Sequence, residues 1–314
     1  MLKYFKVDQN GLKEAQGQDH NIILLEEEHD PKYTDQLIEK YDLPNDLFLG
    51  SNLPEEVTRL EHLEGTKLNN PTSLVLMDLS ANMEHSIEER LQPLSFIKSD
   101  ELLILHICEN SDFFERLLEK FGPQITNYTE FVAWSIFQIS THFLKDLQER
   151  KKIIDDLENS AKTTAKNEEL FRMIDAERNM TYLQETLNNQ HSTLKELFEE
   201  TDFVAELDNA GLIYDIQLRD RQAKKMVDVY TSLMENISGL FTDMMNNNLN
   251  HLMKYLDSLS IVLSVPALIG TIWGMNAGGL LFKKSSYGFL IILAISIILG
   301  ALMALHLYKK DYSK

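Results

Sequence analysis

Residues Ser258–Asn276 read SLSIVLSVPALIGTIWGMN and form the most informative stretch of the sequence. The stretch is apolar enough to enter a bilayer, yet it carries Ser258, Ser260, Ser264 and Thr271. A second apolar run, Tyr287–Tyr308, follows a short loop and has very few polar side chains. Two adjacent runs of this length predict two membrane-spanning helices. Their unequal polarity indicates that the first faces water and the second faces lipid.

The composition limits the class of protein and its compartment. The chain holds 49 acidic and 30 basic residues, a formal charge of -19, which excludes nucleic acid as a partner because phosphate contacts need clustered cations. The single cysteine, Cys108, excludes an intrachain disulfide framework and favours a reducing compartment. Met1–Asp8 lacks the apolar core of a signal peptide. We therefore expect a multi-pass protein of the cell (plasma or inner) membrane with two spans and both termini in the cytoplasm.

The first 125 residues alternate short apolar runs with polar breaks, which is typical of an α+β domain with a mixed sheet. We predict helices over Pro54–Leu63, where a proline and acids suit a helix N-terminus, and over Ser111–Phe121. The strongest strand signals lie at Asn21–Leu25, Ser73–Leu79, Leu94–Ile97 and Leu102–Cys108.

Long helices are predicted from residue 126 onward, because no proline occurs between Asn127 and Pro266. We expect helices over Tyr128–Ser160 and Glu168–Glu200, and a third that begins near Asp202 and continues to Trp273. If continuous, the third would be about 100 Å long at 1.5 Å per residue. The expected organisation is a cytoplasmic α/β domain (1–125), cytoplasmic helices with the start of the stalk helix (126–250), a pore-lining span (251–276), an external loop (277–286), a second span (287–308) and a basic cytoplasmic tail (309–314).

The third helix carries a polar stripe with a mean step of 3.5 residues, the repeat of a left-handed supercoil. A solvated helix face would explain its upstream half. The stripe continues into the membrane segment, however, where polar groups need partners or water, and several copies around an axis would supply that water as a pore. The polar stripe comprises Ser232, Asn236, Gly239, Asp243, Asn246, Asn250, Met253, Asp257, Ser260, Ser264, Ala267 and Thr271. A neighbouring apolar stripe for packing comprises Met226, Tyr230, Leu233, Ile237, Leu240 and Met244.

The chemistry at the ends of the span suits a cation. Gly274 lets the backbone turn at the end of the helix. A ring of Asn276 carboxamide oxygens could bind the water shell of Mg²⁺, because this ion prefers oxygen ligands and gives up its water reluctantly. Near the inner entrance, Met253 and Leu256 could close a pore by dewetting, and Asp257 could add a carboxylate ring. The alternative is that Met253 and Leu256 pack ordinarily while Asp257 lies in the headgroup region.

The tripeptide Gly274-Met275-Asn276, at the end of the first of two C-terminal spans and after Pro266 and Trp273, resembles the signature of CorA-type divalent-cation transporters. The early KYDLPNDLF and LPEEVTRLE segments are also similar to that family. The resemblance implies a funnel-shaped homopentamer whose stalk helices line a pore for hydrated Mg²⁺, with Co²⁺, Ni²⁺ or Zn²⁺ in some members. The implied pore positions are Asn250, Met253, Leu256 and the Gly274-Met275-Asn276 filter.

The resemblance also implies regulatory carboxylates between protomers that bind Mg²⁺ and hold the channel shut. Asp215 is our candidate, and Glu55 and Glu56 are weaker ones. Divalent cations, lipid and further copies of the chain are therefore the expected partners. Mg²⁺ is expected as the transported and regulatory ion, without an organic cofactor.

Several residues depart from the family pattern. Ala267 follows the proline where many relatives have a polar residue, the Gly270-Thr271 order differs, and Trp273 replaces the usual tyrosine. The loop AGGLLFKKSSY has no acid, and Lys283 and Lys284 would repel a divalent ion. The ion therefore remains open between Mg²⁺ and Zn²⁺, the latter as in transporters of the ZntB kind, with proton coupling as an option.

An enzyme and a non-conducting scaffold are the alternatives to a transporter. An enzyme is not expected, because the sequence contains no Gly-rich phosphate loop, nucleophile elbow or paired-histidine zinc helix. A membrane-anchored coiled-coil scaffold or sensor that conducts no ions is the remaining competitor. Such a protein would need neither Asn276 nor a small, polar stripe inside its span.

Overall fold

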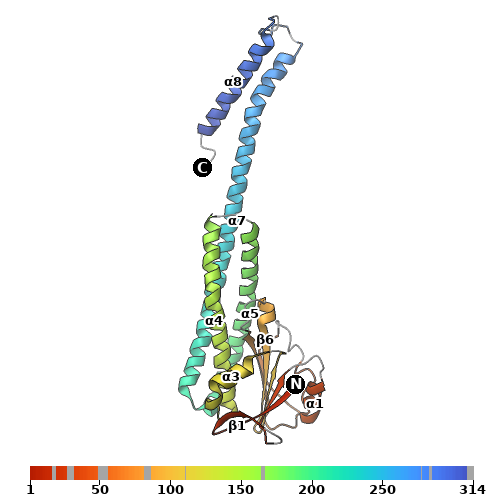
Figure 1. Ribbon diagram of the computed structural model, residues 1–314, viewed down its shortest axis with the longest axis vertical. Helices are drawn as coiled ribbons and strands as arrows, with labels where there is room; N and C mark the ends of the chain where they lie inside the picture. The colour runs from red at the N-terminus through yellow and green to blue at the C-terminus, as the bar shows by residue number, and fades with distance from the viewer. Residues whose placement is uncertain are drawn as a thin grey trace. The chain divides into compact units, whose positions relative to one another are not determined.

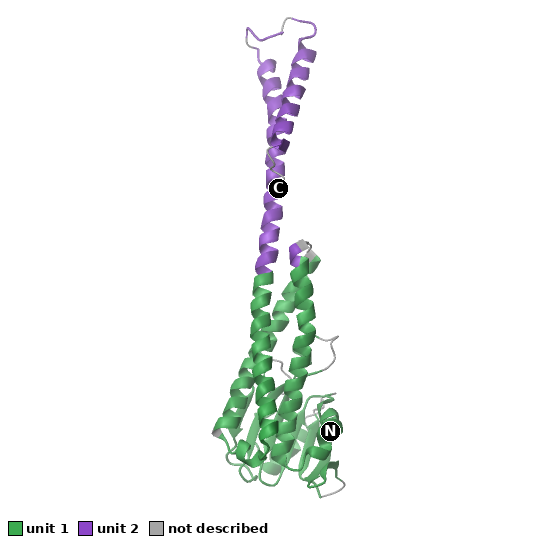
Figure 2. Cartoon of the chain, turned by 90° about the vertical axis from the view of Figure 1, so that its left-hand side faces the viewer, with its two compact units in different colours: residues 1–160, 166–237 green, residues 161–165, 238–314 purple. Residues whose placement is uncertain are grey.

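The computed structural model describes most of the chain as two compact units (Figure 2). The first contains Met1–Ser160 and Lys166–Ile237, and the second contains Ala161–Ala165 and Ser238–Lys314. The residues that the structure describes are 1–15, 19–26, 32–48, 56–80, 86–109, 111–163, 167–276, 278–282 and 285–309.

A mixed β-sheet forms the base of the first unit, as the sequence predicts. Over the described residues it has seven strands in the order β2-β1-β3-β7-β6-β5-β4, with β3 and β7 parallel and the other pairs antiparallel. The four predicted strands correspond to β3, β5, β6 and β7. The strand bounds are β1 (Leu2–Asp8), β2 (Gly11–Glu14), β3 (Ile22–Glu26), β4 (Arg59–His62), β5 (Thr72–Leu79), β6 (Leu91–Lys98) and β7 (Leu103–Ile107).

One predicted helix in this region is wrong. Where a helix was expected over Pro54–Leu63, Arg59–His62 forms the edge strand β4, with Arg59 opposite Val75 of β5. Pairing with the open side of β5 satisfies backbone groups on both strands and outweighs the local helical preference. Pro54 and Glu55 lie outside the described residues.

Successive residues of a strand point to opposite sides of the sheet. Apolar side chains are buried on both of these sides. Ile97 belongs to a core with Leu37 of α1 (Lys32–Tyr41). Phe96, the preceding residue, points to the other side, where its ring lies 6.4 Å from that of Phe131. Helices α3, α4 and α5 cover that second side (Figure 1). Their bounds are Phe113–Phe121, Tyr128–Thr163 and Asn167–Glu200, and a 3₁₀ turn, Gly122–Gln124, follows α3.

A buried ionic network ties the sheet to α4. Asp146 of α4 accepts hydrogen bonds from Arg90 at 2.7 Å and Arg150 at 2.5 Å, and Arg90 ends the short helix α2 (Ile87–Arg90). Nearby, His142 Nδ1 lies 2.8 Å from a carboxylate oxygen of Asp78 on β5. Removing one partner of such a network would leave an uncompensated buried charge, so the network fixes how α4 sits on the sheet.

The third long helix begins later than predicted. The chain first makes a short helix, then Asp208 adopts a left-handed backbone with φ of 44°. Asn209 restarts the helix as its N-cap, because its side-chain oxygen accepts a hydrogen bond from the Leu212 amide at 3.0 Å. The two helices are α6 (Phe203–Leu207) and α7 (Ala210–Gly274). Helix α7 continues through Pro266, so the expected continuity is confirmed.

In the first unit, α7 packs against α4 and α5 through a seam with a 3.5-residue step. Arg219 places its guanidinium 4.3 Å above the ring centre of Phe137 on α4, and Asp220 contacts His191 of α5 at 2.5 Å. The seam consists of Ile216, Ala223, Val227, Tyr230, Met234 and Ile237. The predicted apolar stripe is right at Tyr230 and Ile237. Met226, Leu233 and Met244 are half-buried and Leu240 is exposed, because the buried face is centred about one residue further round the helix.

The second unit contains the end of α7 and helix α8 (Gly288–Lys309). Both helices are long and apolar enough to cross a membrane. The second predicted span, Tyr287–Tyr308, matches α8 to within one residue at each end.

Candidate functional site

Every member of the polar stripe, from Ser232 to Thr271, is exposed in the single chain. This includes the residues predicted to line a pore within the membrane segment, among them Asp257, Ser264 and Ala267. The stripe thus forms an open face of α7.

Helix α8 covers the opposite face of α7. Gly300 of α8 lies so close to Pro266 that an added Cβ would be 3.1 Å from the proline Cγ, and the rings of Trp273 and Phe289 are 6.5 Å apart. Between Asp257 and Gly274, the half-buried residues of α7 are Ser258, Val262, Val265, Pro266, Ile269 and Trp273. At about 100° per residue, these lie roughly opposite the polar stripe. The contact with α8 therefore leaves the polar stripe free.

Three hydroxyl groups of the polar stripe donate hydrogen bonds inside their own helix. Ser260 donates to the Leu256 carbonyl at 2.9 Å, Ser264 donates to the Ser260 carbonyl at 2.7 Å, and Thr271 donates to the Ala267 carbonyl at 2.8 Å. Each hydroxyl oxygen keeps lone pairs that can accept a further hydrogen bond. Such a face can accept hydrogen bonds from water, including the water shell of a cation.

An exposed apolar seam lies beside the polar stripe and was missed at the sequence level. Its members are spaced alternately by four and three residues, the pattern by which supercoiled helices pack, and this spacing could have revealed it. No part of the described chain buries the seam, since its residues stay 42% to 62% exposed. The exposed seam comprises Met245, Leu249, Leu252, Leu256, Leu259 and Leu263. Its position suits packing against α7 of another copy.

The Gly274-Met275-Asn276 motif lies where α7 ends. The Met275 amide donates to the Ile272 carbonyl at 3.3 Å, and Met275 and Asn276 are both exposed. The indole of Trp273 donates to the Leu281 carbonyl at 3.1 Å, which ties the following loop to the helix end. Any side chain at Gly288 would clash, because its Cβ would lie 2.2 Å from the Phe282 carbonyl oxygen. Lys283 and Lys284 lie outside the described residues.

The candidate gate residues are also uncovered in the single chain. Met253 is 50% exposed and Leu256 is 45% exposed, while Asn250 and Asp257 are exposed on the same side of α7. Ordinary packing within one chain therefore does not explain these apolar side chains. Their role as a gate depends on further copies and remains a prediction.

The regulatory candidates do not form a metal site within one chain. Asp215 is exposed on α7 in the first unit, beside the exposed Tyr214 and Leu218. Glu56 is largely buried and forms an ion pair with Arg59, while Glu55 lies outside the described residues. Among the described residues, no group of three or more His, Cys, Asp or Glu side chains is placed to hold a metal ion.

Comparison with known proteins supports the resemblance noted from the motif. The chain resembles the cobalt/magnesium transport protein CorA of Thermotoga maritima at 20% identity over 159 residues, which are 51% of this chain and 45% of that protein. The match thus spans less than half of that relative.

Solved structures show the same fold. The complete CorA magnesium transporter from Methanocaldococcus jannaschii matches with a TM-score of 0.75 and 15% identity, covering 97% of this chain and 96% of that one. The ZntB cytoplasmic domain from Vibrio parahaemolyticus matches with a TM-score of 0.61 and 12% identity, covering 78% of this chain and 96% of that domain. The model of the family described as "CorA-like Mg2+ transporter protein" matches residues 17–309. The chain therefore belongs to the CorA-like Mg²⁺ transporter family.

Proposed function

We propose that the chain assembles with copies of itself into a homopentamer that carries divalent cations, above all Mg²⁺, across the cell membrane. One observation carries the proposal: the polar stripe of α7 is exposed along its whole length, opposite the face that α8 covers. Polar groups inside a bilayer need water or partners, and a ring of α7 helices supplies a water-filled path. Family membership supports the same conclusion, and the pentameric number comes from resemblance to the family.

The three faces of α7 then have separate tasks. The polar stripe lines the path, and the exposed seam from Met245 to Leu263 packs between neighbouring copies, with Leu256 at the border between the two. Helix α8 lies outside against lipid. Ser260, Ser264 and Thr271 present oxygen acceptors along the path. Mg²⁺ loses its water reluctantly, so a path of such acceptors suits the hydrated ion.

The two ends of the path have different chemistry. At one end, a ring of Asn276 carboxamides acts as the filter, since neutral oxygens attract the ion without trapping it. At the other end, Met253 and Leu256 form apolar rings that close the path by dewetting, and Asp257 draws cations toward them. We further propose that both termini lie in the cytoplasm.

Transport of Zn²⁺ is the second candidate function. The likeness to the ZntB cytoplasmic domain and the absence of an acid in the loop after Asn276 favour it. A comparison of flux for Mg²⁺, Co²⁺, Ni²⁺ and Zn²⁺, with and without a proton gradient, decides between the two.

The filter is tested by metal uptake into vesicles that contain the purified full-length protein. We expect Asn276→Ala to change Mg²⁺ flux at least about tenfold, because the filter's oxygen ring is lost. Asn247→Ala is the matched control, since Asn247 is an exposed asparagine of α7 outside the polar stripe. Unchanged flux in Asn276→Ala would remove the filter assignment. A wild-type protein that passes none of the four metals would support the scaffold alternative.

A further inference from the structure

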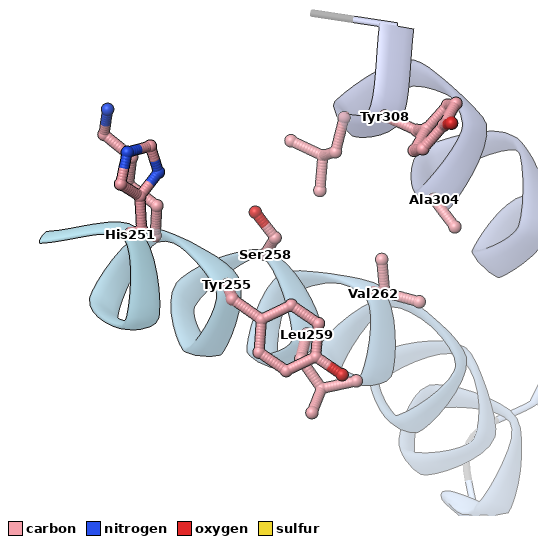
Figure 3. A pocket seen from close by; sticks show the side chains of 9 residues that line it. His251, Tyr255, Ser258, Leu259, Val262, Ala304 and Tyr308 are labelled. Carbon is pink, nitrogen blue, oxygen red and sulfur yellow. The ribbon is translucent and has the colours of Figure 1, made fainter. Parts of the chain in front are cut away.

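A groove of about 520 Å³ separates α7 from the last turns of α8 within the second unit (Figure 3). His251, Lys254, Tyr255 and Ser258 share one face of α7, because they are spaced three or four residues apart. Ala304 and Tyr308 contribute from α8. The groove lies away from the polar stripe, so the proposed ion path does not use it.

One end of the groove is polar and cationic. Lys254 makes no ion pair within the described part of the chain, and none of the described residues that line the groove is acidic, although the chain carries a charge of -19. The Ser258 hydroxyl points into the space between the helices (Figure 3). Unlike Ser260 and Ser264, it makes no hydrogen bond to the described residues. Lys254, His251 and Ser258 thus offer unused donors to an anion.

The other end of the groove is apolar. Leu259, Val262 and Ala304 line it as α7 continues into its most apolar part. From His251 to Val262 the groove follows about 17 Å of helix, at 1.5 Å per residue. Tyr255 of α7 and Tyr308 of α8 also line the groove, and tyrosines are enriched at the level of lipid headgroups.

We propose that this groove binds an anionic phospholipid of the cytoplasmic leaflet. Lys254, His251 and Ser258 contact the phosphate, and one acyl chain lies along Val262 and Ala304. A neighbouring copy of α8, which has no acid from Gly288 to Lys309, or of the exposed seam of α7 would leave Lys254 buried without an anion, which is costly. The proposal rests on the membrane location of α7 and α8, and not on ion transport.

Native mass spectrometry of the full-length protein, titrated in detergent with phosphatidylglycerol or phosphatidylcholine, tests the proposal. We expect phosphatidylglycerol to bind at least about fivefold more tightly, the effect of roughly one lysine contact at a membrane surface. Lys254→Gln should weaken phosphatidylglycerol binding about fivefold. Lys309→Gln is the matched control, because Lys309 is the last residue of α8 and does not line the groove, and it should change binding less than twofold.

A second variant tests the groove without altering charge. Ala304→Phe fills the apolar end and should prevent phosphatidylglycerol binding while the protein keeps its oligomeric state. Equal losses in Lys254→Gln and Lys309→Gln would show diffuse surface attraction and overturn the proposal. It is also overturned if the two lipids bind equally, or if Ala304→Phe leaves binding unchanged.

Discussion

The two halves of α7 have related repeats but different surroundings. In the first unit, the chain itself buries the helix, so that Val227 is 0% exposed and Ile237 is 2% exposed. In the second unit, the seam at the same spacing stays open, with Leu249 at 57% and Leu263 at 62% exposure. In the first unit, the apolar residues of this repeat are therefore buried by the chain itself. In the second unit, only molecules outside the chain can bury them.

In the second unit, the faces of α7 also differ from one another in what covers them. Helix α8 covers one side, the leucine-rich seam stays exposed, and the small polar residues face away from α8. In the first half, by contrast, the buried seam, the Asp220–His191 contact and the Arg219 guanidinium over Phe137 hold α7 in place. Mutations in the two halves should consequently affect different properties.

The largest expected contrast comes from truncating one apolar residue in each half. Ile237→Ala should lower the free energy of unfolding of the first unit by about 2 to 5 kcal/mol, because it leaves a cavity in a buried seam. Leu252→Ala, in the exposed seam, should leave that stability within about 0.5 kcal/mol and instead weaken association of copies. Chemical denaturation and native mass spectrometry measure the two effects. Equal loss of stability in both variants would contradict the comparison.

A pH effect of slightly smaller size should belong to the first unit. Burial on β7 lowers the pKa of His106 from 6.5 to about 4. The folded state keeps this histidine neutral while the unfolded chain takes up a proton below pH 6.5, so stability is full above that pH. It should fall by about 3 kcal/mol as the pH drops toward 4.

His106→Gln provides the control for this effect, because glutamine does not titrate. Between pH 7 and pH 4, the wild type should lose about 3 kcal/mol more unfolding free energy than His106→Gln loses. A difference that is constant over this range would show that His106 does not couple folding to pH.

The smallest predicted effect concerns regulation. Asp215→Ala should leave folding intact, because the side chain is exposed, and should weaken inhibition of flux by internal Mg²⁺ about fivefold, a typical coupling between sites. Glu235→Ala is the control, since Glu235 is an exposed acid on the same helix. Unaltered inhibition in Asp215→Ala would remove this residue from the proposed regulatory site.

Long-range features of the sequence predicted much of the fold. The absence of proline from Asn127 to Pro266 predicted α4 and α5 closely, since little else interrupts a helix over such lengths. The buried strands were found because continuous apolar runs need a sheet with both faces covered. The polar stripe was found from its 3.5-residue step, and its members are exposed in the single chain, while its role in lining a pore stays a prediction.

Short or edge elements were harder to predict. The strand β4 depends on pairing with β5, which the local sequence does not reveal, and β1 and β2 were missed. The alternation of Phe5 and Val7 with polar residues, followed by Asn10-Gly11, was a hairpin signal that could have found the latter two. The filter, gate and regulatory residues depend on neighbouring copies, so one chain cannot place them together.

Labelling of single cysteines along α7 tests the central claim most directly. Replacing Cys108 with alanine gives a cysteine-free background, because it is the only cysteine in the sequence. In the reconstituted protein, cysteines at Ser260, Ser264 and Thr271 should react with a charged, water-soluble thiol reagent, and those at Val262, Val265 and Ile269 should not. Reaction at the second set as fast as at the first, or no reaction at either, would contradict a water-filled path along the polar stripe.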